Sequence, residues 1–102
     1  MILKAYVVGL IDVQDPDAYV EYAQNAPATI AKYGGRYVIR NGTKHELEGA
    51  LPAERWVVLE FPSVRQAKRW FDSEEYQAIR PIRTNASSST LFIIEGYDAP
   101  VA

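Results

Sequence analysis

The 102-residue sequence contains no cysteine, a single methionine and a single histidine. The absence of cysteine excludes disulfide bonds, thiolate catalysis and cysteine-ligated metals, and it leaves the redox environment undetermined. No apolar run approaches the roughly 20 residues that a membrane-spanning helix needs, and the first residues lack the basic segment of a secretory signal. The sequence therefore predicts a soluble, cytoplasmic protein that has no membrane partner.

The chain also lacks a strong charge of either sign. Its formal net charge is −2, and the lysines and arginines are scattered among acidic residues. Nucleic acids select basic residues clustered on one face, so no nucleic-acid partner is expected. Hydrophobic residues make up 48% and charged residues 24% of the chain, which is typical of a folded protein. A chain of this length builds one hydrophobic core, so residues 1–102 are predicted to form a single domain.

Four segments rich in β-branched and aromatic residues are predicted strands. They span residues 2–13, 36–40, 55–61 and 90–97. The dipeptide Asn41-Gly42 follows the second of them and is typical of a type I′ hairpin turn, which needs a positive φ at both positions. We therefore expect residues 43–48 to fold back as a short edge ribbon.

The first predicted helix begins after Asp15, a good N-cap, with Pro16 in the first turn, where no N–H is needed. Apolar residues recur at intervals of three and four until Gly34-Gly35, which favours a left-handed stop. Pro27 lies inside this pattern and cannot donate a hydrogen bond to the preceding turn. The sequence therefore predicts a kink or break near Asn25.

A second helix is predicted after residue 63, because Ser63 and Gln66 have the spacing of a capping box. Ser73 is placed to cap a further short helical piece, whose regularity Pro81 should limit. The serine-rich residues 86–89 are predicted to be a loop that leads into the last strand.

The predicted order of elements is βαββαβ, which indicates an α+β fold of the ferredoxin-like type. Such a fold has an antiparallel sheet in the spatial order 4-1-3-2, with both helices on one face. The strands that begin at Ile2, Arg55 and Thr90 carry apolar residues on both faces, whereas helices cover only one. The uncovered face predicts a homodimer in which two sheets meet. A monomer with a partly exposed sheet is the alternative.

Several short motifs are distributed along the chain. They are Ala26-Pro27, residues 32–37, Glu48-Gly49, residues 60–63, residues 73–77 and residues 95–97. Together they resemble the domain of unknown function 1330 family, which is placed in the dimeric α/β barrel superfamily. Residues 80–83, Arg-Pro-Ile-Arg, depart from the uninterrupted helix of similar sequences.

The resemblance covers nearly the whole chain and implies a ferredoxin-like protomer without an established activity. Superfamily relatives include cofactor-independent monooxygenases, lactone isomerases and haem-using enzymes, whose sites lie between the sheet and the helices. The resemblance leaves open whether this chain is an enzyme.

Two residues are candidate acid–base groups. His45 is the one side chain whose ordinary pKa lies near neutrality, but the predicted edge ribbon favours a solvated histidine instead. Glu60 interrupts an apolar strand. It is interpreted either as the partner of Arg36 or Arg40 in a cross-strand ion pair, or as a desolvated carboxylate with a raised pKa beside the helix-covered cleft. We expect no metal site, because no second histidine is present to join His45.

Large amphipathic rings are numerous for so small a core. Most are expected to be core residues, yet some can line a pocket between helices and sheet that orients a small organic ligand. Arg36, Arg80 and Arg83 are candidates to hold a carboxylate there, although solvated arginine is the alternative. The predicted ligand-binding residues are Tyr22, Asn25, Tyr33, Arg36, Trp56, Tyr76 and Arg83.

The sequence thus supports two hypotheses. The first is a dimeric domain that binds a small organic molecule, without a cofactor, and carries an oxygenase-type or isomerase-type activity. The second is a non-catalytic dimerisation module.

Overall fold

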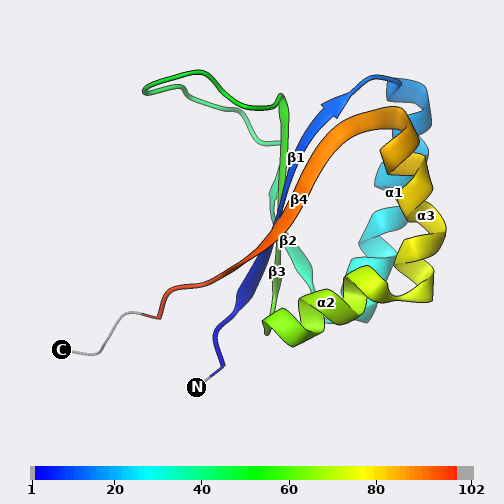
Figure 1. The fold of residues 1–102 in the computed structure, drawn as a ribbon, viewed down its shortest axis with the longest axis vertical. Coiled ribbons are helices and arrows are strands. Elements are labelled where there is room, and N and C mark those ends of the chain that lie inside the picture. Colours follow the sequence, from blue (N-terminus) through cyan, green and yellow to red (C-terminus); the bar gives the residue numbers. More distant parts are fainter. Residues whose placement is uncertain (1, 99–102) are drawn as a thin grey trace.

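The computed structural model describes residues 2–98. The chain forms β1 (Ala5–Val13), α1 (Pro16–Lys32), β2 (Arg36–Arg40), β3 (Arg55–Phe61), α2 (Val64–Asp72), α3 (Glu74–Ala86) and β4 (Ser87–Glu95). The strands form one antiparallel sheet in the order β2-β3-β1-β4, and the helices lie on one face of it (Figure 1). This is the predicted order 4-1-3-2 read from the opposite edge, so the predicted α+β fold is confirmed. Within residues 2–98, no helix has the length and apolarity required to span a membrane.

The hydrophobic core lies between the sheet and the helices. Alternate residues of β1 and β3 face this layer, and the pairs Ala5 with Phe61 and Val7 with Leu59 are buried across the two central strands. Trp70 of α2 and Tyr76 of α3 are the most deeply buried of the large side chains that the helices contribute, at 1% and 0% exposed. The rings lie close together, with 4.2 Å between their centroids.

The opposite face of the sheet carries no helix. Its central row runs across all four strands, because Ile39 pairs with Val58, Val58 with Val8, and Val8 with Phe92. Ile39 and Phe92 are 46% and 43% exposed. We call this side of the sheet the open face. It comprises the central row and the residues that point the same way in the two adjoining rows, which are Arg36, Glu60, Tyr6 and Ile94 in one and Trp56, Leu10 and Thr90 in the other. The prediction that the main strands carry apolar residues on both faces is confirmed.

Helix α1 begins as predicted but does not break at its proline. The Asp15 carboxylate accepts a hydrogen bond from the backbone N–H of Ala18, and Gly34 ends the helical segment with a φ of +81°. The expected kink or break near Asn25 is wrong in its stronger form, because the helix continues through Pro27 to Lys32. The carbonyl of Ala23, four residues before Pro27, accepts instead from the guanidinium of Arg40 at 2.8 Å.

The C-terminal half is more regular than the sequence predicts. The expected short piece after Ser73 is a 13-residue helix, α3, that continues through Pro81. The expected loop at residues 86–89 is wrong, because β4 begins at Ser87 and pairs with the end of β1. The hydroxyl of Ser87 donates to the carbonyl of Arg83 at 2.6 Å. Ser87 is therefore both the residue that caps the end of α3 and the first residue of β4.

The predicted edge ribbon is also wrong, because residues 43–48 form no strand. Asn41 has a φ of +52°, but Gly42 has no positive φ, so the type I′ turn is not made. This segment has few apolar side chains to bury, and Leu47 is 96% exposed. The connection between β2 and β3 instead projects on the side of the sheet opposite the helices (Figure 1).

Candidate functional site

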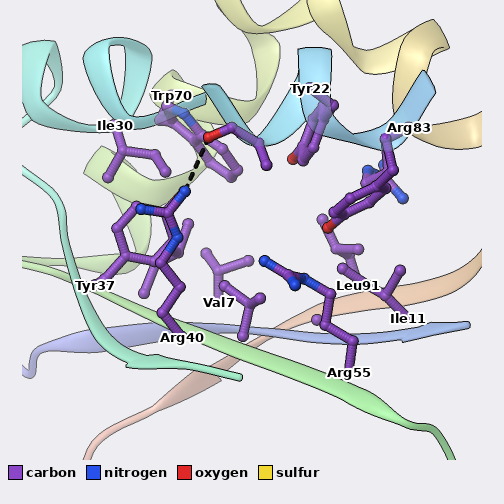
Figure 2. Close-up of a pocket in the computed structure, with 15 residues that line it drawn as sticks. Val7, Ile11, Tyr22, Ile30, Tyr37, Arg40, Arg55, Trp70, Arg83 and Leu91 are labelled. Carbon is purple, nitrogen blue, oxygen red and sulfur yellow. Dashed lines mark hydrogen bonds between the residues drawn. The ribbon is translucent and has the colours of Figure 1, made fainter. Parts of the chain in front are cut away.

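Two adjoining hollows lie between the helices and the sheet. The first, which we call the inner cavity, has a volume of about 30 Å³ and lies among α1, α2, α3 and the centre of the sheet (Figure 2). The second, which we call the outer groove, has a volume of about 410 Å³ and lies among α2, α3 and β4. The residues that line both hollows are Val7, Trp70, Arg83 and Leu91, which form a shared wall. The inner cavity has room for about two water molecules, whereas the outer groove falls in the size range of small-molecule sites.

Arg83 in the shared wall is the most buried arginine of the site. It is only 4% exposed, although it carries a full positive charge. Its Nε donates to the Tyr76 hydroxyl at 3.3 Å, and an Nη donates to the Ser89 hydroxyl. Its Cζ also lies 5.9 Å from the centroid of the Tyr22 ring. These partners are all neutral, and no ion pair joins Arg83 to a carboxylate among residues 2–98.

A second guanidinium enters the inner cavity from β3. Arg55 occupies a helix-facing position of the strand, and Figure 2 shows its guanidinium pointing into the space between sheet and helices. Its Cζ lies 5.1 Å from the centroid of the Tyr19 ring. Its Nε is buried and has no hydrogen-bond partner among the described residues. Arg55 therefore adds positive charge to the cavity without a compensating carboxylate.

A third guanidinium, that of Arg40, lies at the rim. It donates to the Ala23 carbonyl and is stacked 4.5 Å from the Tyr37 ring centroid (Figure 2). Arg40 is exposed to solvent as a residue, so its charge costs less than that of Arg83. Its hydrogen bond attaches β2 to the middle of α1 and thereby closes one side of the inner cavity.

The tyrosines of the cavity remain neutral over the physiological range. Burial, and then the neighbouring Tyr76, raises the pKa of Tyr22 far above its ordinary value. Burial also raises the pKa of Tyr19 and of Tyr37, although nearby arginines oppose the shift. The hydroxyls of Tyr22 and Tyr76 are 2.8 Å apart and hydrogen-bonded to each other. The inner cavity is therefore lined by neutral rings and cationic guanidinium groups, with no acidic residue among its lining.

Three of the predicted ligand-binding residues lie at this site. Tyr22 and Arg83 line the inner cavity, and Tyr76 lies directly behind them through its hydroxyl contacts. Tyr22 and Arg83 project from different helices toward the same space (Figure 2).

The other four lie elsewhere. Asn25 is exposed on α1 and donates to the carbonyl of Glu21. Tyr33 lies beyond the end of α1, where its hydroxyl donates to Glu75 at 2.6 Å. Arg36 and Trp56 belong to the open face, since each occupies the opposite alternation to the helix-facing residues of its strand.

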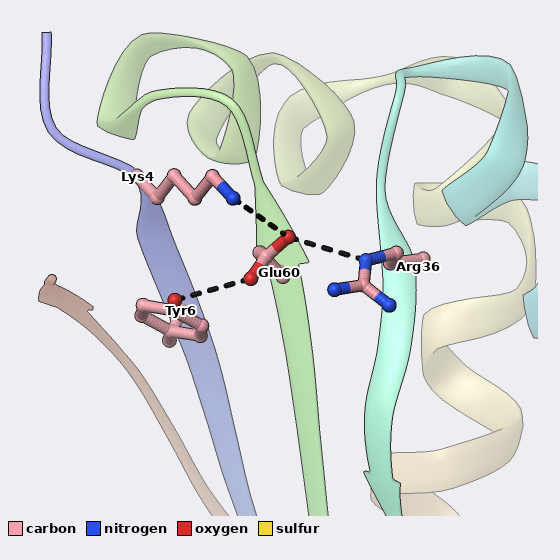
Figure 3. Close-up of polar contacts among 4 residues, drawn as sticks. All are labelled: Lys4, Tyr6, Arg36 and Glu60. Carbon is pink, nitrogen blue, oxygen red and sulfur yellow. Dashed lines mark hydrogen bonds and ion pairs between the residues drawn. The ribbon is translucent and has the colours of Figure 1, made fainter.

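Glu60 is also on the open face, where it forms the predicted cross-strand pair. Its carboxylate accepts from Arg36 Nε at 3.2 Å and from the Tyr6 hydroxyl at 3.1 Å, and Lys4 Nζ lies 3.7 Å away (Figure 3). Partial burial would raise the pKa of Glu60, but the hydrogen bonds from Tyr6 and Arg36 and the positive charges of Arg36 and Lys4 outweigh it and lower that pKa. The alternative of a raised pKa beside the helix-covered cleft is wrong, because the strand alternation places this side chain on the opposite face.

His45 is exposed in the projecting connection between β2 and β3. It is remote from both hollows and lines neither of them. Among residues 2–98, no group of three or more histidine or acidic side chains is placed to hold a metal ion.

Sequence reasoning missed Arg55 and Arg40 as site residues. Strand alternation contains a signal that could have identified Arg55: it has the same parity as the buried Leu59 and Phe61, so the alternation places an arginine on the core-facing side. A charged residue at such a position is an exception worth pursuing. Arg40 offers no such signal, because a bulge between Tyr37 and Ile39 reverses the alternation of β2.

Residues 4–97 match the model of a family described as Domain of unknown function (DUF1330). A protein of unknown function from Rhodopseudomonas palustris has a similar structure, with a TM-score of 0.76 and 16% identity over 97% of this chain and 86% of that chain. SnoaB, a cofactor-independent oxygenase from Streptomyces nogalater, gives a TM-score of 0.64 with 12% identity over 95% and 96% of the two chains.

A dimeric protein of unknown function with a ferredoxin-like fold, from Bacteroides fragilis, gives a TM-score of 0.51 with 14% identity over 91% of this chain and 96% of that chain. At these identities the structural likenesses show a shared fold and nothing further. None of the curated proteins matches the sequence.

Proposed function

The chain belongs to the DUF1330 family, and we propose that it binds a small organic molecule in the outer groove, with the inner cavity extending the site toward the sheet. The observation that carries the proposal is a groove of about 410 Å³ whose walls combine the rings of Trp70 and Phe71 with a few charged groups. Apolar walls with a small number of polar groups are typical of small-molecule sites.

Catalysis is the stronger form of this proposal. An oxygenation or isomerisation of the bound molecule without a cofactor is supported by the shared fold with an oxygenase that needs none. The hydrogen-bonded hydroxyls of Tyr22 and Tyr76 lie beside Arg83, whose positive charge would stabilise negative charge that develops on a bound molecule. Oxygen uptake in the presence of phenolic compounds, measured with an oxygen electrode, tests the oxygenase reaction.

A non-catalytic dimerisation module is the second candidate function, and the observation that favours it is the open face. The apolar row from Ile39 to Phe92 is uncovered in a single chain, and two copies of the chain could bury this row against each other in a twofold dimer. The connection between β2 and β3, with its exposed Leu47, projects on that same side. Dimerisation through this face is compatible with ligand binding, because the groove is lined mainly by residues of the helices and of the helix-facing side of the sheet. Phe92 on the edge strand β4 is the groove residue that also belongs to the apolar row. For either function we propose a cytoplasmic location.

Ligand binding is tested by filling the groove. Thr84 is exposed and lines the groove, so Thr84→Trp should occupy it without disturbing the core. We expect small aromatic probes (phenol, benzamide and benzoate) to raise the melting temperature of the native protein, because they bind only the folded state. The increase should be lost in Thr84→Trp.

Ala78→Trp is the matched control, because Ala78 is exposed on the same helix but lines neither hollow. It should respond to the probes as the native protein does. Failure of all the probes, or equal responses of the two tryptophan variants, would exclude the groove as the binding site.

A further inference from the structure

The arginines around the two hollows form no ion pair with a carboxylate among residues 2–98. The ion pairs of residues 2–98 involve Lys4, Lys32 and Arg36, and all of them lie outside the site. Arg55 and Arg83 line the inner cavity, while Arg80 and Arg83 line the groove, and none of these three is paired with a carboxylate. Such an arrangement is unusual, since buried charges in proteins are generally paired.

Arg83 is the most deeply buried of these three arginines. A guanidinium has five N–H donors, and the neutral oxygens of Tyr76 and Ser89 take up only part of that capacity. With only 4% of the residue exposed, water compensates the remaining charge poorly. An anion that reached Arg83 from one of the two hollows that it separates would supply the charge partner that residues 2–98 do not provide.

Two further groups extend the positive field on either side of Arg83. On the groove side, Arg80 is held with its Cζ 5.0 Å from the Phe71 ring centroid, and its buried Nε has no partner among the described residues. On the cavity side, the Nε of Arg55 is also buried and has no hydrogen-bond partner among the described residues. The one acidic residue that lines the groove, Asp72, is exposed and makes no ion pair with either arginine.

We propose that the ligand is a small organic acid whose carboxylate pairs with the guanidinium of Arg83, while its apolar body lies in the outer groove. This inference rests on the proposed small-molecule site and assigns it a substrate class. A carboxylate matches the planar donor geometry of arginine, and the positive field of Arg55 and Arg80 favours the same charge. The rings of Trp70 and Phe71 favour an organic anion over an inorganic one, because they offer apolar contacts that phosphate does not use.

Benzoate and benzamide form the matched probe pair, because they share shape and differ in charge. We expect isothermal titration calorimetry to show benzoate binding about tenfold to a hundredfold tighter than benzamide, as a charge-assisted hydrogen bond would produce. Inorganic phosphate should bind more weakly than benzoate. Equal affinities for benzoate and benzamide would overturn the assignment of an acid while leaving the small-molecule site intact, whereas failure of both probes would remove the site itself. Phosphate binding as tight as that of benzoate would overturn the organic body.

Arg83→Met separates a ligand-binding role from a structural one. The substitution replaces an uncompensated buried charge with an apolar side chain, so the ligand-free variant should melt at the same temperature as the native protein or higher. Benzoate affinity should fall to that of benzamide, and benzamide affinity should be nearly unchanged. Arg83→Lys keeps the charge but loses the planar geometry, so it should fall between the two.

A variant outside the shared wall guards against misfolding. Arg55→Met removes charge from the inner cavity at a residue whose Nε makes no hydrogen bond, and it should weaken benzoate binding more than benzamide binding. Arg69→Met is the control, because Arg69 is exposed on α2 and lines neither hollow. A lower melting temperature of ligand-free Arg83→Met with unchanged benzoate affinity would identify Arg83 as a structural residue and refute the proposal. Equal benzoate affinities of Arg55→Met and Arg69→Met would also refute the proposal, because the positive charge of Arg55 would then have no effect on binding of the acid.

Discussion

Arginine has two different roles in this chain, and the position of each residue decides which. Arg36 lies on the open face and is paired with Glu60. Arg83 lies inside and is surrounded by neutral oxygens and an aromatic ring. The first arrangement satisfies both charges within the chain, so it is a structural feature. The second leaves a positive charge without a carboxylate partner among residues 2–98, which is the basis for proposing an anionic ligand.

The Glu60 cluster should make stability depend on pH in a defined direction. Its pKa in the folded protein is lowered from the ordinary value of 4.5, so the ionised cluster stabilises the fold above that value. The contribution is lost as the pH falls through the pKa of the folded state. Glu60→Gln should therefore be less stable than the native protein at neutral pH, and the difference should shrink below pH 4.5. Urea unfolding at a series of pH values measures it.

Glu46→Gln is the control for this experiment, because Glu46 is an exposed residue of the connection between β2 and β3 and makes no ion pair within residues 2–98. Its stability should follow that of the native protein at each pH. A stability difference between Glu60→Gln and the native protein that stays constant across the acidic range would show that the charge of Glu60 has no role in it.

At the scale of the element, α1 and β2 are coupled through a defect. Pro27 leaves the Ala23 carbonyl without its intrahelical donor, and Arg40 of β2 provides a replacement at 2.8 Å. A buried or half-buried carbonyl that loses its partner costs about 1–3 kcal/mol. The proline therefore creates an acceptor that ties the edge strand to the helix.

A double-mutant cycle tests this coupling. Arg40→Met in the native background should lower the free energy of unfolding by about 1–2 kcal/mol, because it removes the hydrogen bond and the contact with the Tyr37 ring. In the Pro27→Ala background the helix supplies its own N–H to the Ala23 carbonyl. The same substitution should then cost about 1 kcal/mol less, because only the ring contact is lost. Equal costs in the two backgrounds, measured by urea unfolding, would show that the hydrogen bond contributes nothing.

The sequence predicts the elements well where periodicity and capping act together. Asp15 marks the start of α1, and the period-two pattern of residues 55–61 marks β3. The predictions from sequence that were wrong share one cause: contacts with distant parts of the chain, and not local composition, decide whether these segments form strands. Residues 87–89 have the composition of a loop, yet β1 offers them a pairing edge. Asn41-Gly42 has the composition of a hairpin turn, yet residues 43–48 have no apolar face that would be buried if they paired with β2 as a strand.

The candidate site was predictable only in part for the same reason. The sequence identifies the layer between helices and sheet, and Tyr22, Tyr76 and Arg83 do meet there. It does not reveal which arginines share that space, because this depends on the register of β3 and on the bulge in β2. Trp56 shows the converse error, since its aromatic character alone suggested a pocket residue.

At the scale of the whole molecule, the sheet has one covered face and one open face. The open face combines the apolar row of Ile39, Val58, Val8 and Phe92 with the polar cluster around Glu60. An apolar row bordered by charged groups is the usual composition of a specific interface. The two faces therefore divide the proposed functions, with ligand binding proposed for the helical side and self-association proposed for the open side.

Light scattering at micromolar concentration should report a particle of twice the 11.5 kDa chain mass. Val8 lies at the centre of the open face, between Val58 and Phe92, so Val8→Lys should place two like charges against each other across the twofold axis and produce a monomer. Phe92→Lys makes the same test at a more exposed position, where the fold is less at risk, and circular dichroism reports whether each variant is folded.

Val20→Lys is the control, because Val20 is 50% exposed on α1 and lies on the helical side. It should remain dimeric, since only a charge on the open face opposes the contact between sheets. A native protein of single-chain mass, or folded Val8→Lys and Phe92→Lys variants that both remain dimeric, would exclude the sheet face as the interface.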